Sequence, residues 1–136
     1  MSELFSAEWM NAYKTAWNGE PKLTEPLGEI NFSTAIGYGF LDEDEPRGVL
    51  VVENGEATFA GAYDNQQMNW DIRAGSDLWD QWMNSPPNMT KIGLAYTMRK
   101  LQFKQGDYAA MLKEPRMAGP FIKSVETMAQ VKISDT

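Results

Sequence analysis

The first stretch of the chain has the spacing of an amphipathic helix. Its apolar residues recur at intervals of three and four positions, namely Phe5, Trp9, Tyr13, Ala16 and Trp17. Ser6 is a suitable N-cap, so we expect a helix over residues 6–18. Proline interrupts helical hydrogen bonding, so Pro21 and Pro26 predict an irregular connection over residues 19–28.

The period of the pattern changes to two from Ile30. Bulky residues then occupy every second position, namely Ile30, Phe32, Thr34, Ile36, Tyr38 and Phe40. This alternation predicts a strand with one bulky face. A second strand is expected over residues 47–53, and Asn54 with Gly55 is typical of a tight hairpin that returns as a third strand over residues 56–62.

Two more strands with two helices between them follow from the same reasoning. A fourth strand carries Met68, Trp70, Ile72 and Ala74, and a short fifth strand carries Leu101 and Phe103. Ser76 is expected to cap the first helix, whose apolar stripe is Leu78, Trp79, Trp82 and Met83. Asn88 is expected to cap the second, which carries Met89, Ile92, Ala95 and Tyr96.

The last part of the chain predicts two helices. Gly106 and Asp107 begin the first one, which Pro115 ends. Pro120 suits the first position of the final helix, whose apolar face is Phe121, Ile122, Val125, Met128 and Ala129. Because Gly119 directly precedes that proline, the final helix is either a movable lid or an ordinary capping helix.

These elements predict an α+β fold in a single domain over residues 1–136, a length that suits one domain. We expect a five-stranded, largely antiparallel sheet covered on one face by helices. The net charge of −7 disfavours nucleic acid as a partner, and no apolar run approaches the roughly 18 residues that cross a bilayer. We therefore expect a cytoplasmic protein with no stable membrane insertion.

The chain contains no cysteine and no histidine. Disulfides, thiolate nucleophiles, histidine-based triads and the usual zinc shells are therefore excluded. Asp42 to Glu45 resemble a cation site only in charge, because the run lacks the spaced ligands of a calcium loop, so a solvated hairpin is preferred. Gly37 and Gly39 lie inside a strand and are expected to allow close packing or a bend. No cofactor or metal is expected.

The order of elements resembles the sterol carrier protein type-2 family over roughly residues 5–128. The matching segments are MNWDIRAGSDLWDQWM and KLQFKQGDYAAML, and the clearest local match is Lys-Leu-x-Phe-Lys-x-Gly-Asp at residues 100–107. The resemblance implies a tunnel between the sheet and its helices that holds a fatty acid, an acyl-CoA or a sterol. Trp70, Trp79 and Trp82 would narrow that space for a sterol.

The pocket implied by this resemblance lies between the bulky sheet face and the later helices. Its expected sheet residues are Phe32, Ile36, Tyr38, Trp70, Ile72, Leu101 and Phe103. Its expected helical residues are Trp79, Trp82, Met83, Met98, Tyr108, Met111, Met117, Phe121, Val125 and Met128. Flexible methionines adapt to ligands of varied shape, although filling of an ordinary core is the preferred interpretation of any single methionine.

Five basic residues lie close to the expected pocket mouth, namely Arg99, Lys100, Lys104, Lys113 and Arg116. They either hold an acidic head group or are simply solvated. The function predicted is non-catalytic carriage of a lipid-like molecule. Two alternatives stay open. The first is an enzyme that acts on a bound acyl or steroid-like substrate through Asp71, Tyr96 or Tyr108, or an accessory subunit that serves a partner enzyme. The second is a protein-interaction module with an apolar groove. The sequence leaves the oligomeric state unknown.

Overall fold

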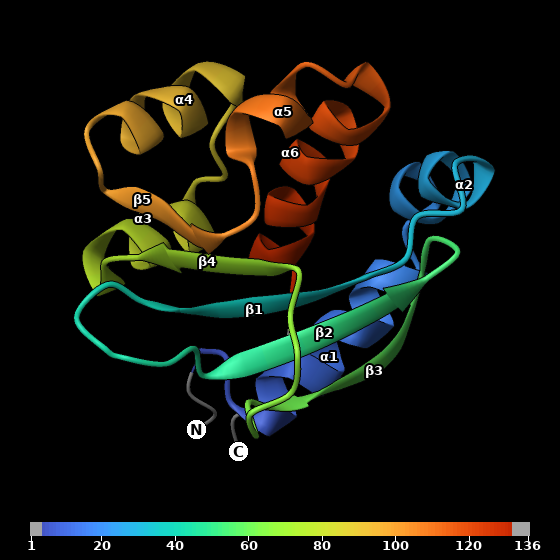
Figure 1. Cartoon of the computed structure of the whole chain (residues 1–136), viewed down its shortest axis with the longest axis horizontal. Helices are drawn as coiled ribbons and strands as arrows, with labels where there is room; N and C mark the ends of the chain where they lie inside the picture. Colours follow the sequence, from blue (N-terminus) through green and yellow to red (C-terminus); the bar gives the residue numbers. More distant parts are fainter. Residues whose placement is uncertain (1–3, 132–136) are drawn as a thin grey trace.

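A five-stranded mixed sheet forms one layer of the structure, and helices cover one of its faces (Figure 1). The computed structural model describes residues 4–131. Its helices are α1 (Ala7–Asn18), α2 (Pro21–Glu29), α3 (Ser76–Asn84), α4 (Met89–Thr97), α5 (Tyr108–Leu112) and α6 (Pro115–Ala129). Its strands are β1 (Thr34–Phe40), β2 (Gly48–Glu53), β3 (Glu56–Ala62), β4 (Trp70–Ala74) and β5 (Leu101–Gln105). The expected α+β class is confirmed.

The strands lie in the order β3-β2-β1-β4-β5. Strands β1 and β4 are parallel, and the other three neighbouring pairs are antiparallel. Asn54 and Gly55 have φ values of 50° and 87°, the left-handed conformations that the predicted tight hairpin between β2 and β3 requires. The chain then passes from β3 to β4 across the face that carries no helix (Figure 1). This crossing allows β4 to join β1 in parallel.

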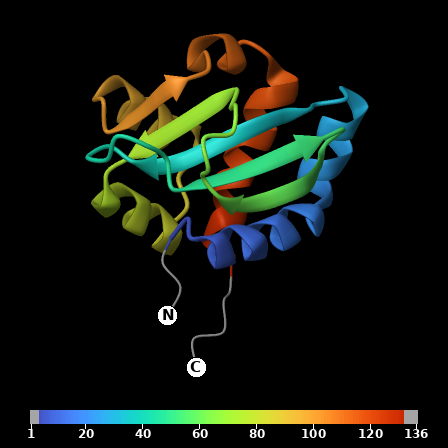
Figure 2. The same cartoon turned by 60° about the horizontal axis from the view of Figure 1, so that its bottom comes forward.

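The helical layer packs on the sheet through an aromatic cluster. The ring centroid of Phe5 lies 5.1 Å from that of Trp79 and 5.6 Å from that of Tyr38. The ring centroids of Trp79 and Trp82 are 5.9 Å apart. The indole of Trp79 also donates a 2.8 Å hydrogen bond to the carbonyl of Gly39 in β1. These contacts attach Phe5, just before α1, and Trp79 of α3 to the sheet, and Figure 2 shows both helices on the same side of it. This end of the molecule is a filled core.

The segment predicted to be irregular is the helix α2. Its N-cap Glu20 accepts a 3.0 Å hydrogen bond from the backbone N–H of Lys22. Pro21 is the first helical residue, where the absence of an N–H has no cost. Pro26 lies inside the helix, and packing of the buried Leu23 and Leu27 against the core holds the helix in place despite it. The prediction of an irregular connection was therefore wrong.

The final helix α6 begins at Pro115 and not at Pro120. Glu114 caps it by accepting a 3.1 Å hydrogen bond from the N–H of Arg116. Gly119 and Pro120 therefore lie inside the helix, whereas Gly119 was expected to precede it and Pro120 to be its first residue. The lid hypothesis loses its premise, because the pair is not a hinge between two separate elements.

Two smaller expectations also change. The first strand begins at Thr34, because the chain after α2 still turns, with the N–H of Phe32 donating to the carbonyl of Leu27. Gly75, and not Ser76, is the N-cap of α3, since β4 continues to Ala74 and leaves one residue between the two elements. No helix in residues 4–131 is long and apolar enough to cross a membrane.

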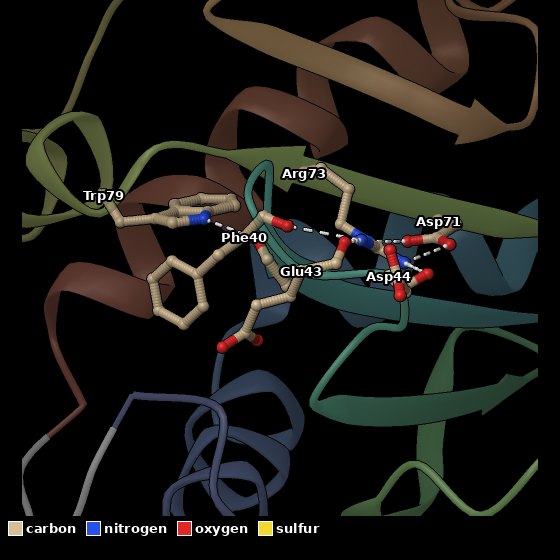
Figure 3. A network of polar contacts seen from close by, with 7 residues as sticks. Phe40, Glu43, Asp44, Asp71, Arg73 and Trp79 are labelled. Carbon is tan, nitrogen blue, oxygen red and sulfur yellow. Dashed lines mark hydrogen bonds and ion pairs between the residues drawn. The ribbon is translucent and has the colours of Figure 1, made fainter.

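The face of the sheet without helices is anchored by a buried ion pair (Figure 3). The guanidinium of Arg73 donates to both carboxylate oxygens of Asp71, at 2.6 and 3.0 Å. It also donates to the carbonyls of Phe40, Glu43 and Asp44, at 3.2, 2.8 and 3.4 Å. The acidic run that the sequence singled out is thus a turn that Arg73 holds against the sheet by its backbone.

Gly37 and Gly39 belong to this same face. A side chain at Gly37 would collide with Met68, and one at Gly39 would come within 2.8 Å of the backbone of Pro46. The crossing segment before β4 and the turn before β2 therefore lie directly on β1. Of the two interpretations of these glycines, the structure shows close packing.

Candidate functional site

A small, partly enclosed cavity of about 50 Å³ lies between the sheet and the helices α5 and α6. The helices α1, α2, α5 and α6 and the strands β1, β4 and β5 contribute to its walls. The residues that line it are Trp17, Leu27, Phe32, Ile36, Tyr38, Trp70, Ile72, Phe103, Met111, Met117, Pro120, Phe121 and Ser124. No lining side chain is charged, so the cavity is suited to an apolar guest.

The sheet wall results from the parallel pairing of β1 and β4. In that register Ile36 is the partner of Trp70, and Tyr38 is the partner of Ile72. Since alternate residues of a strand point to the same face, these four side chains share the helical side of the sheet. The period-two pattern of the sequence is therefore what creates this wall.

The Gly-Asp pair at the end of β5 shapes the same wall. Gly106 has a φ of 97°, and a side chain there would collide with the ring of Trp70. Its absence allows the indole to lie directly against the chain. Asp107 then accepts a 3.0 Å hydrogen bond from the N–H of Ala110 and so starts α5, which carries Met111 to the cavity.

The rim of the cavity is made of side chains that are only partly buried. Trp70, Phe103, Met117 and Phe121 are of this kind, whereas Leu27, Ile36, Ile72 and Met111 are buried. The rings of Phe103 and Phe121 lie 6.0 Å apart, so they connect β5 with α6 across the rim. Solvent therefore reaches the cavity past aromatic and thioether groups.

Two of the residues that line the cavity carry hydroxyl groups. Tyr38 and Ser124 carry them, and both residues are buried. The hydroxyl of Tyr38 lies 3.3 Å from that of Tyr13, which donates to the carbonyl of Ser124 at 3.4 Å. The hydroxyl of Ser124 donates to the carbonyl of Phe121 at 2.6 Å. This row joins α1, β1 and α6 at the inner end of the cavity.

Burial keeps both tyrosines neutral. Removal from water raises the pKa of Tyr38 well above its usual range, and the hydrogen bond with Tyr13 opposes this only in part. Burial likewise raises the pKa of Tyr13, and the neighbouring Tyr38 adds to the effect. A phenolate at this site would be charged in a cavity without a cation in its lining, so both groups stay protonated at neutral pH.

The structure brings nine of the predicted pocket residues to the cavity wall. They are Phe32, Ile36, Tyr38, Trp70, Ile72, Phe103, Met111, Met117 and Phe121. The other predicted residues lie elsewhere: Trp79, Trp82, Leu101, Tyr108, Val125 and Met128 are buried in the surrounding core, Met83 is partly buried against it, and Met98 is exposed. Since Trp79 and Trp82 fill the core beside Phe5, only Trp70 of the three tryptophans narrows the cavity.

Four lining residues were not predicted. Trp17 and Leu27 come from the N-terminal helices, and Pro120 and Ser124 come from α6. Leu27 lies in the segment that the two prolines made appear irregular, so no helical face was considered there. Trp17 did belong to a predicted apolar stripe, and that periodicity was the available signal. Nothing in the local pattern marks Ser124.

The five basic residues near the expected mouth are all exposed: Arg99, Lys100, Lys104, Lys113 and Arg116. Arg116 approaches the carboxylate of Glu114 at 3.5 Å. Among the described residues none of these cations lines the cavity. An acidic head group would have to lie outside the cavity to reach one of them.

The residues considered for catalysis do not meet at the cavity. Asp71 is bound by Arg73 on the opposite face of the sheet. The rings of Tyr96 and Tyr108 stack beside β5 with their centroids 4.1 Å apart, and neither residue lines the cavity. Burial raises the pKa of Tyr108, whose hydroxyl has no hydrogen-bond partner within the described part of the chain. None of the three groups considered as an acid or base therefore lines the cavity.

No protein-family model and no curated protein matches the chain, whereas solved structures do. A crystal structure of sterol carrier protein 2 matches with a TM-score of 0.75 at 18% identity, over 96% of this chain and 100% of that one. A protein from Thermus thermophilus described as possibly a sterol carrier protein matches with a TM-score of 0.64 at 16% identity, over 95% of this chain and 87% of that one. UbiJ-SCP2, a ubiquinone synthesis protein, matches with a TM-score of 0.58 at 10% identity, over 92% of this chain and 90% of that one. The chain therefore has the sterol carrier protein 2 fold, as the resemblance of its sequence predicted.

Proposed function

We propose that the chain binds a lipid-like molecule in this cavity and carries it without changing it chemically. The observation on which the proposal rests is a cavity with a fully uncharged lining between the sheet and α6. The likeness to structures described as sterol carrier protein 2 supports it. Carriage requires burial of the guest and no reacting group.

The guest must widen the cavity on binding. A volume of about 50 Å³ is room for about four water-sized spheres, at roughly 10–15 Å³ each, and a lipid chain is far larger. The rim residues Met117 and Phe121 are only partly buried, and both lie in the first half of α6. Pro120 has no N–H to donate to the carbonyl of Arg116, so this half of the helix is held by fewer hydrogen bonds. We expect α6 to yield there.

The energy of burial favours a long hydrocarbon chain. Each buried methylene contributes about 0.8 kcal/mol, so ten of them contribute about 8 kcal/mol. Association itself costs about 4–15 kcal/mol before any contact is made. Ligands much shorter than ten carbons would therefore not be retained.

Binding can be measured with N-phenyl-1-naphthylamine, an uncharged probe that fluoresces in apolar sites, together with native mass spectrometry. We expect saturable fluorescence, competition by long-chain lipids, and an adduct of one lipid mass per chain. Met117→Trp should weaken probe binding by about tenfold or more, because the larger ring occupies the cavity.

Met98→Trp is the matched control, since that methionine is exposed on the surface just after α4 and does not line the cavity. It should bind the probe like the parent chain. Circular dichroism verifies that both variants fold. Equal probe binding by the two folded variants, or no saturable binding by the parent chain, would contradict carriage in this cavity.

The likeness to UbiJ-SCP2 favours a second candidate function, that of an accessory subunit which holds a lipid for a partner enzyme. The loaded chain incubated alone should then return its lipid unaltered, and conversion should require a second protein. A changed ligand mass after incubation alone would contradict both candidates, because it would make the chain itself an enzyme.

A further inference from the structure

The helix α4 lies at the outer edge of the molecule, where it packs against β5 (Figure 1). Its inner side holds the buried Ile92 and Ala95. Leu94 and Met98 lie one helical turn apart on its outer side, with exposed fractions of 58% and 54%. They are the two most exposed large apolar side chains among the described residues. Because they are neighbours, they form an apolar patch that the fold itself leaves in water.

The charges around this patch are all positive. Residues 81–106 contain no aspartate or glutamate, although the net charge of the whole chain is −7. Lys91 lies one turn before Leu94, and Arg99 and Lys100 directly follow Met98. All three cations are exposed, and none of the ion pairs within residues 4–131 involves them. The outer side of α4 is therefore a positive region on an acidic protein.

The turn that ends α4 places an arginine where helices usually have glycine. The N–H of Lys100 donates to the carbonyl of Ala95 at 2.8 Å, and that of Arg99 donates to the carbonyl of Tyr96 at 3.1 Å. This pair of bonds requires a left-handed residue after the helix, and Arg99 has a φ of 63°. Glycine adopts that conformation freely, whereas any larger residue is strained. The strain is thus borne at a position that holds an exposed cation beside Met98.

Only a layer of rings separates this patch from the cavity. The ring centroid of Tyr96 in α4 lies 6.1 Å from that of Phe103 in β5, which lies 6.0 Å from that of Phe121 in α6. Both phenylalanines line the cavity and are only partly buried. A surface that met the outer side of α4 would therefore lie close to the rim past which solvent reaches the cavity.

We propose that this patch docks on an anionic lipid bilayer, and we call it the docking face: Lys91, Leu94, Met98, Arg99 and Lys100. The proposal rests on the proposed function, because a carrier must meet the membrane with which it exchanges its lipid. Anionic head groups attract the three cations, and the two apolar side chains enter the boundary between head groups and acyl chains.

The size of the docking face favours a bilayer over a protein partner. Specific protein interfaces bury about 20–30 residues on each side, far more than this face supplies. A bilayer needs only weak and reversible contact. Each cation close to an anionic surface strengthens binding about fivefold, so three together supply about a hundredfold.

Flotation of the chain with vesicles tests the proposal. The vesicles contain phosphatidylcholine alone, or phosphatidylcholine with about 30 mol% phosphatidylglycerol, an amount that gives the surface a negative potential. We expect binding to the anionic vesicles at low salt. Binding to neutral vesicles, or in about 0.5 M sodium chloride, should be at least about tenfold weaker because salt screens exposed charges.

Arg99→Gln combined with Lys100→Gln should weaken binding to the anionic vesicles by about ten- to thirtyfold. Lys14→Gln combined with Lys22→Gln is the matched control, since it changes the net charge equally on α1 and α2, away from α4 (Figure 1). The control should bind the vesicles like the parent chain. Circular dichroism verifies that both double variants fold.

Arg99→Gly separates docking from folding. Glycine relieves the left-handed strain, so the midpoint of urea denaturation should rise while vesicle binding weakens about fivefold. A purely structural role of Arg99 would change both in the same direction. Met98→Trp should strengthen vesicle binding, because tryptophan favours the membrane interface, and it leaves the cavity lining intact.

Two results would overturn the docking face while carriage stands. One is equal binding of neutral and anionic vesicles by the parent chain, and the other is an equal loss of binding in the two double variants. Binding to polyglutamate without binding to anionic vesicles would also overturn it, in favour of an acidic protein partner. Failure of carriage would appear instead with the naphthylamine probe, which is measured without vesicles, so the two failures are distinguishable.

Discussion

On the face of the sheet without helices, the guanidinium of Arg73 donates hydrogen bonds to four other residues. Its exposed fraction is 2%, and its guanidinium joins Asp71 with three carbonyls of the turn that leads to β2. The sequence showed this residue only as one polar position of an alternating strand. Its burial could not be read from that pattern, because the turn that covers it comes from another part of the chain.

Arg73→Met should lower the free energy of unfolding by about 3–5 kcal/mol, because the carboxylate of Asp71 would stay buried without its partner. Urea denaturation measures this loss. Replacing Asp71 by Leu in the same chain should restore part of it, since both buried charges are then gone.

Arg116→Met is the control for this substitution, because the side chain of Arg116 is 70% exposed and its partner Glu114 is also accessible to water. Its effect should stay below about 1 kcal/mol, as is usual for exposed ion pairs. A loss of similar size in both variants would contradict the special role of Arg73.

At the scale of the elements, the strands followed the sequence pattern closely and the proline-containing helices did not. The alternation around Tyr38 and Ile72 predicted the correct face of β1 and β4. Proline is a strong local signal, yet in α2 and α6 it occupies both the first turn, where it is favourable, and a later turn, where burial of an apolar face compensates for it. Rules that consider only neighbouring residues do not include the free energy of that burial.

Gly119→Ala should stabilise α6 and reduce its ability to yield. Gly119 is exposed inside the helix, and a side chain there meets no other atom within 4 Å. Alanine should therefore raise the free energy of unfolding by about 0.5–1 kcal/mol. Stopped-flow mixing with the naphthylamine probe should also show slower association, because a better-formed helix opens less often.

Gly106→Ala provides the contrast in the same set of measurements. Its φ of 97° and the adjacent ring of Trp70 predict a loss of stability. Faster association in Gly119→Ala would contradict the idea that the first half of α6 is where a guest is admitted.

At the scale of the whole molecule, the hydroxyl row connects the layers. Tyr13 belongs to α1, Tyr38 to β1 and Ser124 to α6, so three elements from distant parts of the chain meet at the inner end of the cavity. The candidate site therefore shares its polar groups with the contacts that hold the fold together. Substitutions in this row should therefore alter both ligand binding and stability.

The stability of the chain should fall as the pH rises above about 10. The unfolded chain ionises its tyrosines near the ordinary pKa of 10.0, whereas burial keeps Tyr13 and Tyr38 protonated in the folded chain. The folded state then binds more protons than the unfolded state, so each tyrosine lowers the free energy of unfolding by about 1.4 kcal/mol per pH unit in that range.

Urea denaturation between about pH 9 and pH 11 tests this dependence, and Tyr38→Phe should make it less steep because one of the two groups is removed. Below about pH 9 the parent chain should show no change from these residues. A slope in Tyr38→Phe equal to that of the parent chain would show that Tyr38 is not protected in the folded state.

The sequence by itself determined the order of the strands along the chain and the bulky face of the sheet that forms one wall of the cavity. It could do so because alternation and turn chemistry are local properties, which neighbouring residues express directly. Tertiary structure alone decided that Trp79 fills the core while Trp70 lines the cavity, that α2 forms despite Pro26, and that the hydroxyls of Tyr13 and Tyr38 meet. These outcomes depend on which distant segments come into contact, and a side chain receives its burial and its hydrogen-bond partner only when the chain has folded.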